Sequence, residues 1–291
     1  MVEPLKIFSK PALSLHRDRA ADKICDHNFL FEETAKRLVD RIKDTKRLFP
    51  VALDIGCHGG EIVKELRNQE SVKSFFSAEL SPKMAKNNCK GRTIVCDDEF
   101  LPFASNSFDL ILSNLNLHWV NDLPGAFLQM RKALRPDGLL LASMLGGNTL
   151  NELRLAIYEA EMEVEKGWSP RFSPLADLKD LGNLLHRAGF ALPVADIETI
   201  TVSYDHPLKL MLDLRGMGET NANVDRRKTF SRRSTLFRAV EIYKENFAQK
   251  DGRIPATFEI ITLTAWAPDP RQPKPLARGS AKRSLKDALE P

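Results

Sequence analysis

The sequence contains no long apolar run. Nowhere in its 291 residues do apolar side chains continue for the roughly 18–20 positions that a membrane-spanning helix needs. Residues 1–8 lack the apolar segment of a secretory signal, and the acidic Asp18, Asp22 and Asp26 fit poorly with an Arg-rich transit peptide. We therefore expect no membrane span, and a place in a bacterial cytoplasm, or in the mitochondrial matrix if the source is eukaryotic.

The sequence also contains few cysteines and has a small net charge. The four cysteines, Cys25, Cys57, Cys89 and Cys96, form no C-x-x-C pair, which favours reduced thiols over a disulfide scaffold or a zinc site. The 43 basic and 39 acidic residues are interspersed and leave a net charge of +4. Because so small an excess attracts polyanions only weakly, we expect no nucleic-acid partner.

Short apolar runs alternate with helical patterns through the first half of the chain. Strands are predicted at residues 51–55, 72–80, 93–96, 108–113 and 139–144. Helices are predicted at 29–47, 61–67 and 123–134, the last ending at the Pro-Asp-Gly turn of 135–138. This alternation predicts an α/β fold with a doubly wound, mostly parallel sheet built from right-handed βαβ units.

The second half has a different pattern. Helices are predicted at 150–166 and 176–188, and strands at 196–204 and 256–266, the last of them antiparallel. We divide the chain into an irregular arm (1–28), one main domain (29–267) with a helical insertion (205–250), and a basic, poorly ordered tail (268–291). The basic run from Arg226 to Arg238 is typical of a solvated helix face, with a docking surface for an acidic protein as the alternative.

A Gly-rich turn directly follows the first predicted strand. Asp54 lies within that strand, and Gly56, Cys57, Gly59 and Gly60 form the turn. Glycines let the backbone approach a ligand closely, although such a turn can also be only a tight connection. A dinucleotide site would carry Gly-x-Gly-x-x-Gly, which this turn does not match.

Acidic residues stand where the second and third predicted strands end. Glu79 follows Gly60 by nineteen residues, a spacing that suits a carboxylate accepting both ribose hydroxyls of an adenosine. Asp97 could accept a hydrogen bond from the adenine amino group. Either acid alone would be typical of a solvated strand end. Ligands of open α/β sheets, however, bind at the carboxyl ends of the strands, so Glu79 and Asp97 together with the Gly-rich turn predict an adenosine-type cofactor. The predicted cofactor site also includes Leu80, Asp98 and Ser113.

Several of these segments resemble class I S-adenosylmethionine-dependent methyltransferases. The resemblance lies in residues 54–60, 79–84, 97–103, 108–110 and 134–138. It implies a Rossmann-like fold, S-adenosylmethionine as the cofactor, and methyl transfer as the activity. Such transfer mainly requires that the acceptor be aligned and water excluded, so no metal is expected.

Further segments resemble a narrower group, the mitochondrial complex I assembly factors described as protein arginine hydroxylases, together with their bacterial relatives. More distantly, they resemble the malonyl-acyl-carrier-protein methyltransferases of biotin synthesis. The matching segments are 118–124, 146–154, 172–174, 216–221, 255–257 and 278–281. This resemblance implies a protein substrate, such as a respiratory-complex subunit, or a small carboxylated one. Arginine hydroxylation and a non-catalytic role as an assembly chaperone are the alternatives to methyl transfer.

The chain departs from the family pattern at two places. His58 stands where the family has glycine, and there it could crowd the methionine end of the cofactor or contact its carboxylate. In the arm, Ser9 and Lys10 stand where relatives have Asp-Arg, so no role for the arm is carried over. His16 and Asp18 have a His-x-Asp spacing, but their place in the arm makes them poor candidates for an iron site.

Four residues near the fourth and fifth strands are predicted to face the substrate. His118 is the candidate base or orienting group, or else a packed histidine beside Trp119, which we expect to form a pocket wall. Arg154 could hold a malonyl carboxylate, or pair with a neighbour on its own helix. If the substrate is an arginine, Glu152 is the predicted partner of its guanidinium.

Overall fold

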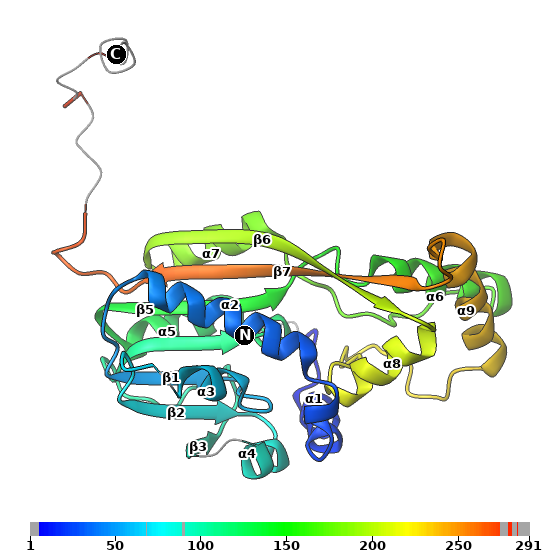
Figure 1. Ribbon diagram of the computed structural model, residues 1–291, viewed down its shortest axis with the longest axis horizontal. Helices are drawn as coiled ribbons and strands as arrows, with labels where there is room; N and C mark the ends of the chain where they lie inside the picture. Colours follow the sequence, from blue (N-terminus) through cyan, green and yellow to red (C-terminus); the bar gives the residue numbers. More distant parts are fainter. Residues whose placement is uncertain (1–5, 68, 89–90, 274–278, 281–283, 285–291) are drawn as a thin grey trace, which may run out of the picture.

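A twisted sheet forms the middle layer of the computed structural model (Figure 1). The structure describes residues 6–67, 69–88, 91–273, 279, 280 and 284. Within these residues seven strands pair in one sheet. In spatial order they are β3 (Arg92–Val95), β2 (Ser74–Glu79), β1 (Val51–Ile55), β4 (Phe108–Asn114), β5 (Leu134–Leu145), β7 (Ile254–Trp266) and β6 (Ala191–Tyr204).

The pairing of the strands confirms the predicted fold class. Strands β1 to β5 are parallel to one another, whereas β7 runs antiparallel to both β5 and β6. The predicted turn at 135–138 is wrong. Those residues form the irregular start of β5, where the register shifts between Phe108 and Leu110, and Asp137 takes a left-handed φ of 63°.

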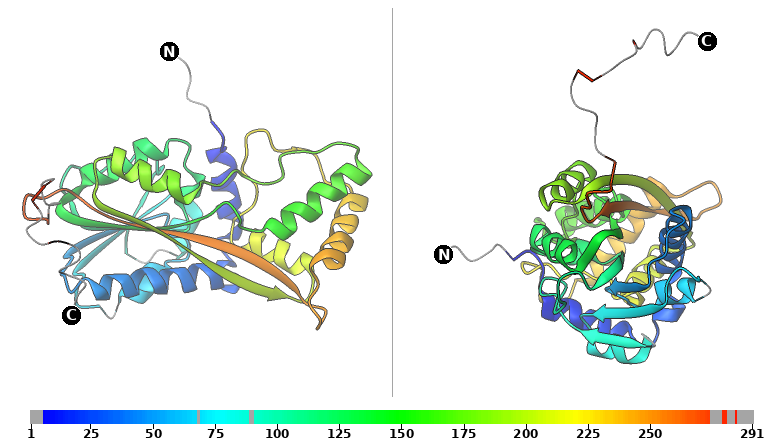
Figure 2. Two further views of the ribbon diagram at one scale, coloured as in Figure 1. Left: turned by 90° about the horizontal axis from the view of Figure 1, so that it is seen from above. Right: turned by 90° about the vertical axis from the view of Figure 1, so that its left-hand side faces the viewer.

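Helices cover both faces of the sheet (Figure 2). On one face α2 (Phe29–Asp44) and α3 (Glu61–Leu66) pack against β1, β4 and β5. On the other face lie α5 (Leu123–Ala133) and α7 (Leu178–Arg187). Helix α4 (Pro82–Asn88) follows β2 and packs near β3. Each helix buries its apolar stripe, as the 3.6-residue spacing of apolar side chains predicts.

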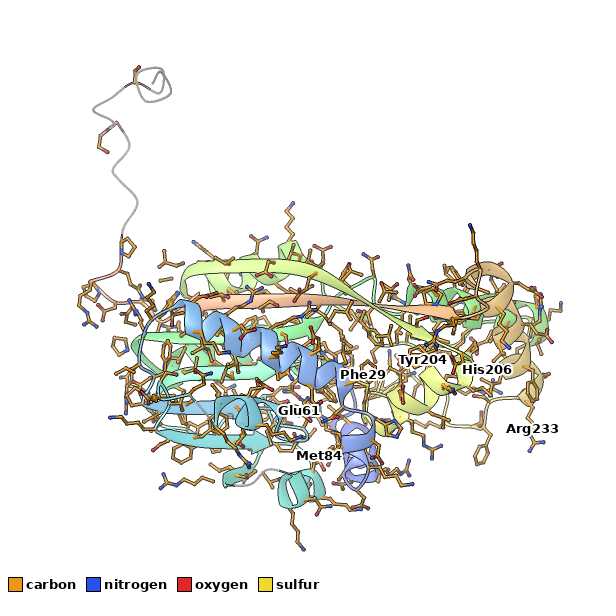
Figure 3. The ribbon with its side chains drawn as sticks, in the orientation of Figure 1. Phe29, Glu61, Met84, Tyr204, His206 and Arg233 are labelled. Atoms are coloured by element: carbon orange, nitrogen blue, oxygen red, sulfur yellow. The ribbon has the colours of Figure 1, made fainter. Side chains whose placement is uncertain are left out.

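The long strands β6 and β7 extend beyond the parallel sheet and carry a second apolar cluster. Helices α6 (Asn151–Val164), α8 (Pro207–Gly216) and α9 (Arg233–Phe247) pack against this extension. In Figure 3, Tyr204, His206 and Arg233 lie at this end, away from Glu61 and Met84. The predicted helical insertion, 205–250, contains α8 and α9, and residues 217–232 between them form no helix.

The N-terminal arm is helical, which corrects the prediction that it is irregular. Helix α1 (Lys10–Ala20) begins after Ser9, whose side chain accepts the N–H of Ala12. A short 3₁₀ turn, η1 (Ile24–Asp26), leads from it to α2. Leu13 is fully buried, so the helix is held by packing as well as by its cap.

The structure bears on the sequence-based predictions about a membrane span, the cysteines and the C-terminal tail. Among the described residues, no helix is long and apolar enough to cross a bilayer. Cys25 and Cys96 are free thiols, but Cys57 is disulfide-bonded, so the expectation of reduced thiols is wrong at that position. Cys89 and most of the predicted tail lie outside the described residues.

One carboxyl group is buried inside β1 without a partner. Asp54 is 0% exposed, and neither of its oxygens has a hydrogen-bond partner within the described residues. Burial, followed by the charges of Glu61 and Glu79, raises the pKa of Asp54 well above its ordinary 3.8. An acid with a raised folded pKa binds more protons in the folded state, so its contribution to stability falls as pH rises above the ordinary value.

We predict that Asp54→Asn stabilises the fold at neutral pH, because the amide needs no proton to be neutral. The gain in free energy of unfolding should be about 1–3 kcal/mol at about pH 8 and close to zero at about pH 4, measured by urea denaturation. Asp109→Asn is the control, because that carboxylate is paired with Arg135 and its loss should destabilise. A gain at Asp54 that is independent of pH would contradict this account.

Candidate functional site

The predicted cofactor residues come together where β1, β2 and β4 end. Gly56 and Gly60 adopt left-handed φ angles of 73° and 77°, which glycine takes without strain. A Cβ atom at Gly56 would lie 2.1 Å from Cγ of Asn116, so only glycine fits at this point. The side chain of Asn116 therefore lies directly against the Gly-rich turn.

Glu79 is the fully buried carboxylate at the end of β2. It accepts hydrogen bonds from the backbone N–H groups of His58 (3.1 Å) and Ser81 (3.0 Å). Burial raises the pKa of Glu79, but the charge of Arg17 and these hydrogen bonds outweigh it, so the pKa lies below its ordinary value. The group is therefore an anion at neutral pH.

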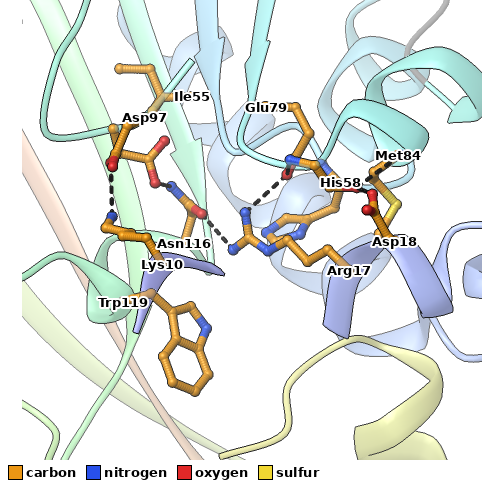
Figure 4. A network of polar contacts seen from close by, with 12 residues as sticks. Lys10, Arg17, Asp18, Ile55, His58, Glu79, Met84, Asp97, Asn116 and Trp119 are labelled. Atoms are coloured by element: carbon orange, nitrogen blue, oxygen red, sulfur yellow. Dashed lines mark hydrogen bonds and ion pairs between the residues drawn. The ribbon is translucent and has the colours of Figure 1, made fainter. Parts of the chain in front are cut away.

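The cation that faces Glu79 comes from the arm. Arg17 of α1 donates from Nη1 to Glu79 Oε1 at 3.1 Å and from Nη2 to Asn116 Oδ1 at 2.6 Å (Figure 4). Its side chain is 0% exposed, and in the described part of the chain it is the one buried arginine or lysine. Such a group needs an anion beside it, because an unpaired buried charge is strongly destabilising.

A second arm cation lies over the end of β3. Lys10 Nζ is 3.0 Å from Asp97 Oδ1 and 3.1 Å from Glu99 Oε1. The adjacent Asp98 accepts the Asn116 amide N–H at 2.9 Å, and burial raises its pKa. No role for the arm was carried over from the family pattern, yet the arm lies across the predicted cofactor site.

His58, the departure from the family pattern, is turned towards the protein interior. It has a left-handed φ of 43°, and its ring stacks on Phe31 with centroids 4.3 Å apart. Its Nε2 donates to the carbonyl of Asn114 at 3.1 Å. Burial, followed by the charge of Arg17, lowers the pKa of His58 to about 4, so the ring is neutral.

The other predicted cofactor residues shape the backbone of this corner. The N–H of Gly59 donates to Glu61 Oε2 at 3.1 Å, and Ser113 Oγ donates to the carbonyl of Ile55 at 2.8 Å. Cys57 is buried in the turn. The half-buried Leu80 packs against an apolar cluster that the arm forms with the rest of the chain, which consists of Phe8, Ala12, Leu13, Trp119 and Ala222.

Next to this corner, His118 and Trp119 hold a carboxylate that the sequence did not predict. They belong to the 3₁₀ turn η2 (Leu117–Trp119), which follows β4. His118 Nε2 lies 3.0 Å from Glu219 Oε2, and Trp119 Nε1 donates to the same oxygen at 2.8 Å. Glu219 Oε1 is buried without a partner among the described residues.

The electrostatics of Glu219 keep it ionised. Its side chain is only 4% exposed. Burial raises its pKa, but the hydrogen bond from His118, then the charges of His118 and Arg17, outweigh that effect and the pKa lies below its ordinary value. A buried anion with an unused oxygen can bind a cation or a strong hydrogen-bond donor.

Glu219 lines an apolar cavity of about 240 Å³. Its other walls include Leu145, Leu150, Leu153, Ile157, Phe172, Met211 and Leu214. A wider groove of about 750 Å³ shares Arg154, Ile157, Arg171 and Phe172 with the cavity, so the two adjoin. The groove is bordered by the exposed Leu155, Tyr158 and Trp168.

The two predicted substrate residues of α6 have different surroundings. Arg154 lines both the cavity and the groove, and its Nη1 donates to the carbonyl of Gly147 at 2.6 Å rather than to a helix neighbour. Glu152 instead accepts the hydroxyl and N–H of Thr257 on β7. It lines neither cavity, so the structure does not bring it to the guanidinium position predicted for it.

Sequence reasoning missed four residues of this site: Lys10, Arg17, Asn116 and Glu219. Asn116 lies between Ser113 and His118, so its place after the fourth strand could have indicated it. Glu219 lies in the segment 216–221 that carries the narrower resemblance. Lys10 and Arg17 carry no such signal, because only the tertiary fold brings α1 to the strand ends.

The residues at the strand ends suit an adenosine-type cofactor. Glu79 is an ionised acceptor, and Asp98 Oδ1 is buried without a partner in the described structure. The space over the Gly-rich turn is filled by side chains, namely Arg17 and Asn116, rather than by backbone. A ligand can therefore enter if those two side chains move. Among the described residues, no cluster of three or more metal-binding side chains occurs.

Comparisons with known proteins agree with this geometry. Residues 53–142 match the family described as a methyltransferase domain. A solved phosphoethanolamine N-methyltransferase 2 of Haemonchus contortus, in complex with S-adenosyl-L-methionine, is 18% identical with a TM-score of 0.51; the match covers 84% of this chain and 57% of that one. At this identity the likeness concerns the fold.

Two curated relatives are closer in sequence. The malonyl-[acyl-carrier protein] O-methyltransferase of Gallionella capsiferriformans is 31% identical over 278 residues, which are 91% of this chain and 93% of the relative. The mitochondrial arginine-hydroxylase NDUFAF5 of Danio rerio is 40% identical over 289 residues, covering 97% of this chain and 89% of the relative. The chain therefore belongs to the NDUFAF5 arginine-hydroxylase family, which is built on a methyltransferase domain.

Proposed function

We propose that this protein binds S-adenosylmethionine at the strand ends and modifies an arginine side chain of a protein substrate. The observation that carries the proposal is Glu219, an ionised, buried carboxylate in an apolar cavity beside the cofactor corner. A guanidinium presents planar N–H donors that match a carboxylate, and its methylene stem suits apolar walls. The relatives named arginine-hydroxylase support the choice of arginine.

The cofactor side of the proposal rests on the acids at the strand ends. Glu79 would accept the ribose hydroxyls, and Asp97 and Asp98 would take the adenine amino group. When bound, S-adenosylmethionine supplies an electron-poor methyl group on its sulfonium. The turn from Gly56 to Gly60 would allow the backbone to approach the ligand.

His118 has two tasks in this proposal. Its Nε2 donates to Glu219 and so orients the carboxylate. When the ring is neutral, the other nitrogen, Nδ1, carries the lone pair, and it has no partner within the described part of the chain. Nδ1 can therefore accept the proton that a guanidinium nitrogen loses when it is modified.

The groove beside the cavity supports a protein substrate. Its volume of about 750 Å³ and its exposed aromatic border, Tyr158 and Trp168, suit a segment of polypeptide whose side chain enters the cavity. The resemblance to complex I assembly factors makes a respiratory-complex subunit the proposed partner, in the bacterial cytoplasm or the mitochondrial matrix.

Whether the substrate arginine gains a methyl group or a hydroxyl group depends on the co-reactant. Methyl transfer needs only S-adenosylmethionine, whereas hydroxylation, the activity in the relatives' name, also needs an oxidant, which S-adenosylmethionine is not. A mass gain of one methylene group or of one oxygen atom on the substrate arginine distinguishes the two.

A malonyl-carrier substrate is the second candidate, and Arg154 favours it. Its exposed guanidinium at the border of cavity and groove could pair with a malonyl carboxylate. The ionised Glu219 at the same cavity argues against it, because two carboxylates repel in a poorly solvated space. A chaperone that uses the cofactor only for shape is a third candidate, and normal complex assembly with a Glu79→Ala variant that cannot bind the cofactor would favour it.

For the cofactor, we predict that Glu79→Gln weakens binding of S-adenosylhomocysteine about tenfold or more, because hydrogen bonds to a charged acceptor contribute about 1.5–3 kcal/mol. Isothermal titration calorimetry measures this directly. The control is Glu198→Gln on β6, a partly exposed glutamate paired with Arg37 outside the site. Equal affinity in both variants would rule out Glu79 as the ribose ligand.

For the substrate, we predict that Glu219→Gln abolishes arginine modification but leaves affinity for S-adenosylhomocysteine within about threefold, because the charge that recognises the guanidinium is lost. Deletion cells complemented with each variant are compared by peptide mass spectrometry. Glu163→Gln, on the exposed face of α6, should restore the modification fully. Retained modification in Glu219→Gln would refute the proposed substrate site.

A further inference from the structure

Arg17 occupies the acceptor that the cofactor would use. Its guanidinium bonds Oε1 of Glu79 and Oδ1 of Asn116, which are the side chains at the ribose position and against the Gly-rich turn. Ribose hydroxyls and Arg17 therefore compete for the same carboxylate. Cofactor binding at Glu79 requires Arg17 to release it.

Released from Glu79, Arg17 still needs an anion. The side chain is 0% exposed and lies within the influence of three acids, Glu79, Glu219 and Asp98. Burial disfavours its charge, and the acids outweigh that effect and raise its pKa, so the guanidinium remains protonated. A charged group in this position must form a new ion pair, because leaving it unpaired is strongly unfavourable.

The cofactor itself brings a carboxylate, on its methionine part. We propose that Arg17 is the ligand of that carboxylate, and that it exchanges Glu79 for the cofactor when the cofactor binds. This inference rests on the proposed function. A guanidinium recognises a carboxylate by two parallel hydrogen bonds, and Arg17 has an unused donor, since its Nε has no partner in the described residues.

The exchange requires movement of a side chain rather than of the arm. Helix α1 is anchored near Arg17 by Asp18, which accepts hydrogen bonds from Ser81 and from the backbone of Lys83. At its other end, the N–H of Ser9 donates to the carbonyl of Ala222 at 2.7 Å. An arginine side chain can swing through several rotatable bonds while its helix stays in place.

Glu219 is the competing destination for Arg17. Its carboxylate already accepts hydrogen bonds from His118 and Trp119 through one oxygen. If Arg17 moved to the other oxygen, the substrate cavity would lose its anion. The two destinations of Arg17, the carboxylate of the cofactor and Glu219, can be distinguished by experiment. Only a contact with the cofactor requires that the ligand carry a carboxylate.

The test compares two ligands that share the adenosine part. S-adenosylhomocysteine carries the amino-acid carboxylate, and 5′-methylthioadenosine does not. Affinities of both are measured by isothermal titration calorimetry for the full chain and for Arg17→Met. Removing Arg17 frees Glu79 equally for both ligands, so the ratio of the two affinities isolates the contact with the carboxylate.

We expect the wild-type preference for S-adenosylhomocysteine to fall about tenfold or more in Arg17→Met, with 5′-methylthioadenosine binding as well as or better than in the wild type. Arg17→Lys should retain part of the preference. The matched control is Lys10→Met, because Lys10 is the other arm cation paired with a strand-end acid, Asp97. It should change both affinities in parallel and leave the ratio unchanged.

An unchanged ratio in Arg17→Met would overturn the inference and leave Arg17 only as a competitor for Glu79. Thermal unfolding of each variant checks that the fold persists. If the methionine variant does not fold, the ratio is measured in Arg17→Lys, which loses the bidentate contact, and a wild-type ratio there would likewise overturn the inference. If the wild type binds neither ligand, the proposed cofactor fails and the role of Arg17 fails with it, whereas an unchanged ratio refutes only the role of Arg17.

Discussion

The ion pair between Arg17 and Glu79 is the contact on which the rest of the site depends. The end of the sheet gathers the buried acids Asp54, Glu61, Glu79 and Asp98. Burial raises the pKa of Asp54, Glu61 and Asp98, whereas Glu79 remains ionised because Arg17 lies beside it. Breaking a buried pair of this kind costs about 3–5 kcal/mol, because the remaining charge has no partner. The pair therefore contributes to holding the arm on the sheet, together with the contacts of Asp18 and Ser9.

The same arm also contacts residues next to the cavity that Glu219 lines. Residues 7–9 pair with 222–224, directly after Glu219, through the N–H of Ser9 and the carbonyl of Ile7. Phe8 meets Trp119 edge to face with ring centroids 5.5 Å apart. The arm thus contacts Glu79 through Arg17 of α1, and it contacts residues 222–224 through residues 7–9.

The parts of this protein that local sequence determines were predictable. Glycines at Gly56 and Gly60, and Glu79 at the end of an apolar run, indicated the strand ends because a parallel sheet brings such ends together. The helix of the arm was missed, since its Ser9 cap and Leu13 stripe are weak local signals in a polar segment. Glu152 and Glu219 show the limit most clearly. Which of two glutamates faces a cavity depends on how α6 and the segment after α8 pack, and no local pattern contains that information.

The most direct measurement is a crystal structure of the protein with S-adenosylhomocysteine. We expect the ribose hydroxyls to lie on Glu79, Arg17 to have left this carboxylate for that of the ligand, and Asn116 to have moved away from Gly56. Helix α1 should remain in place. A structure with the ligand bound and the Arg17–Glu79 pair intact would contradict the proposed exchange of Glu79 for the ligand.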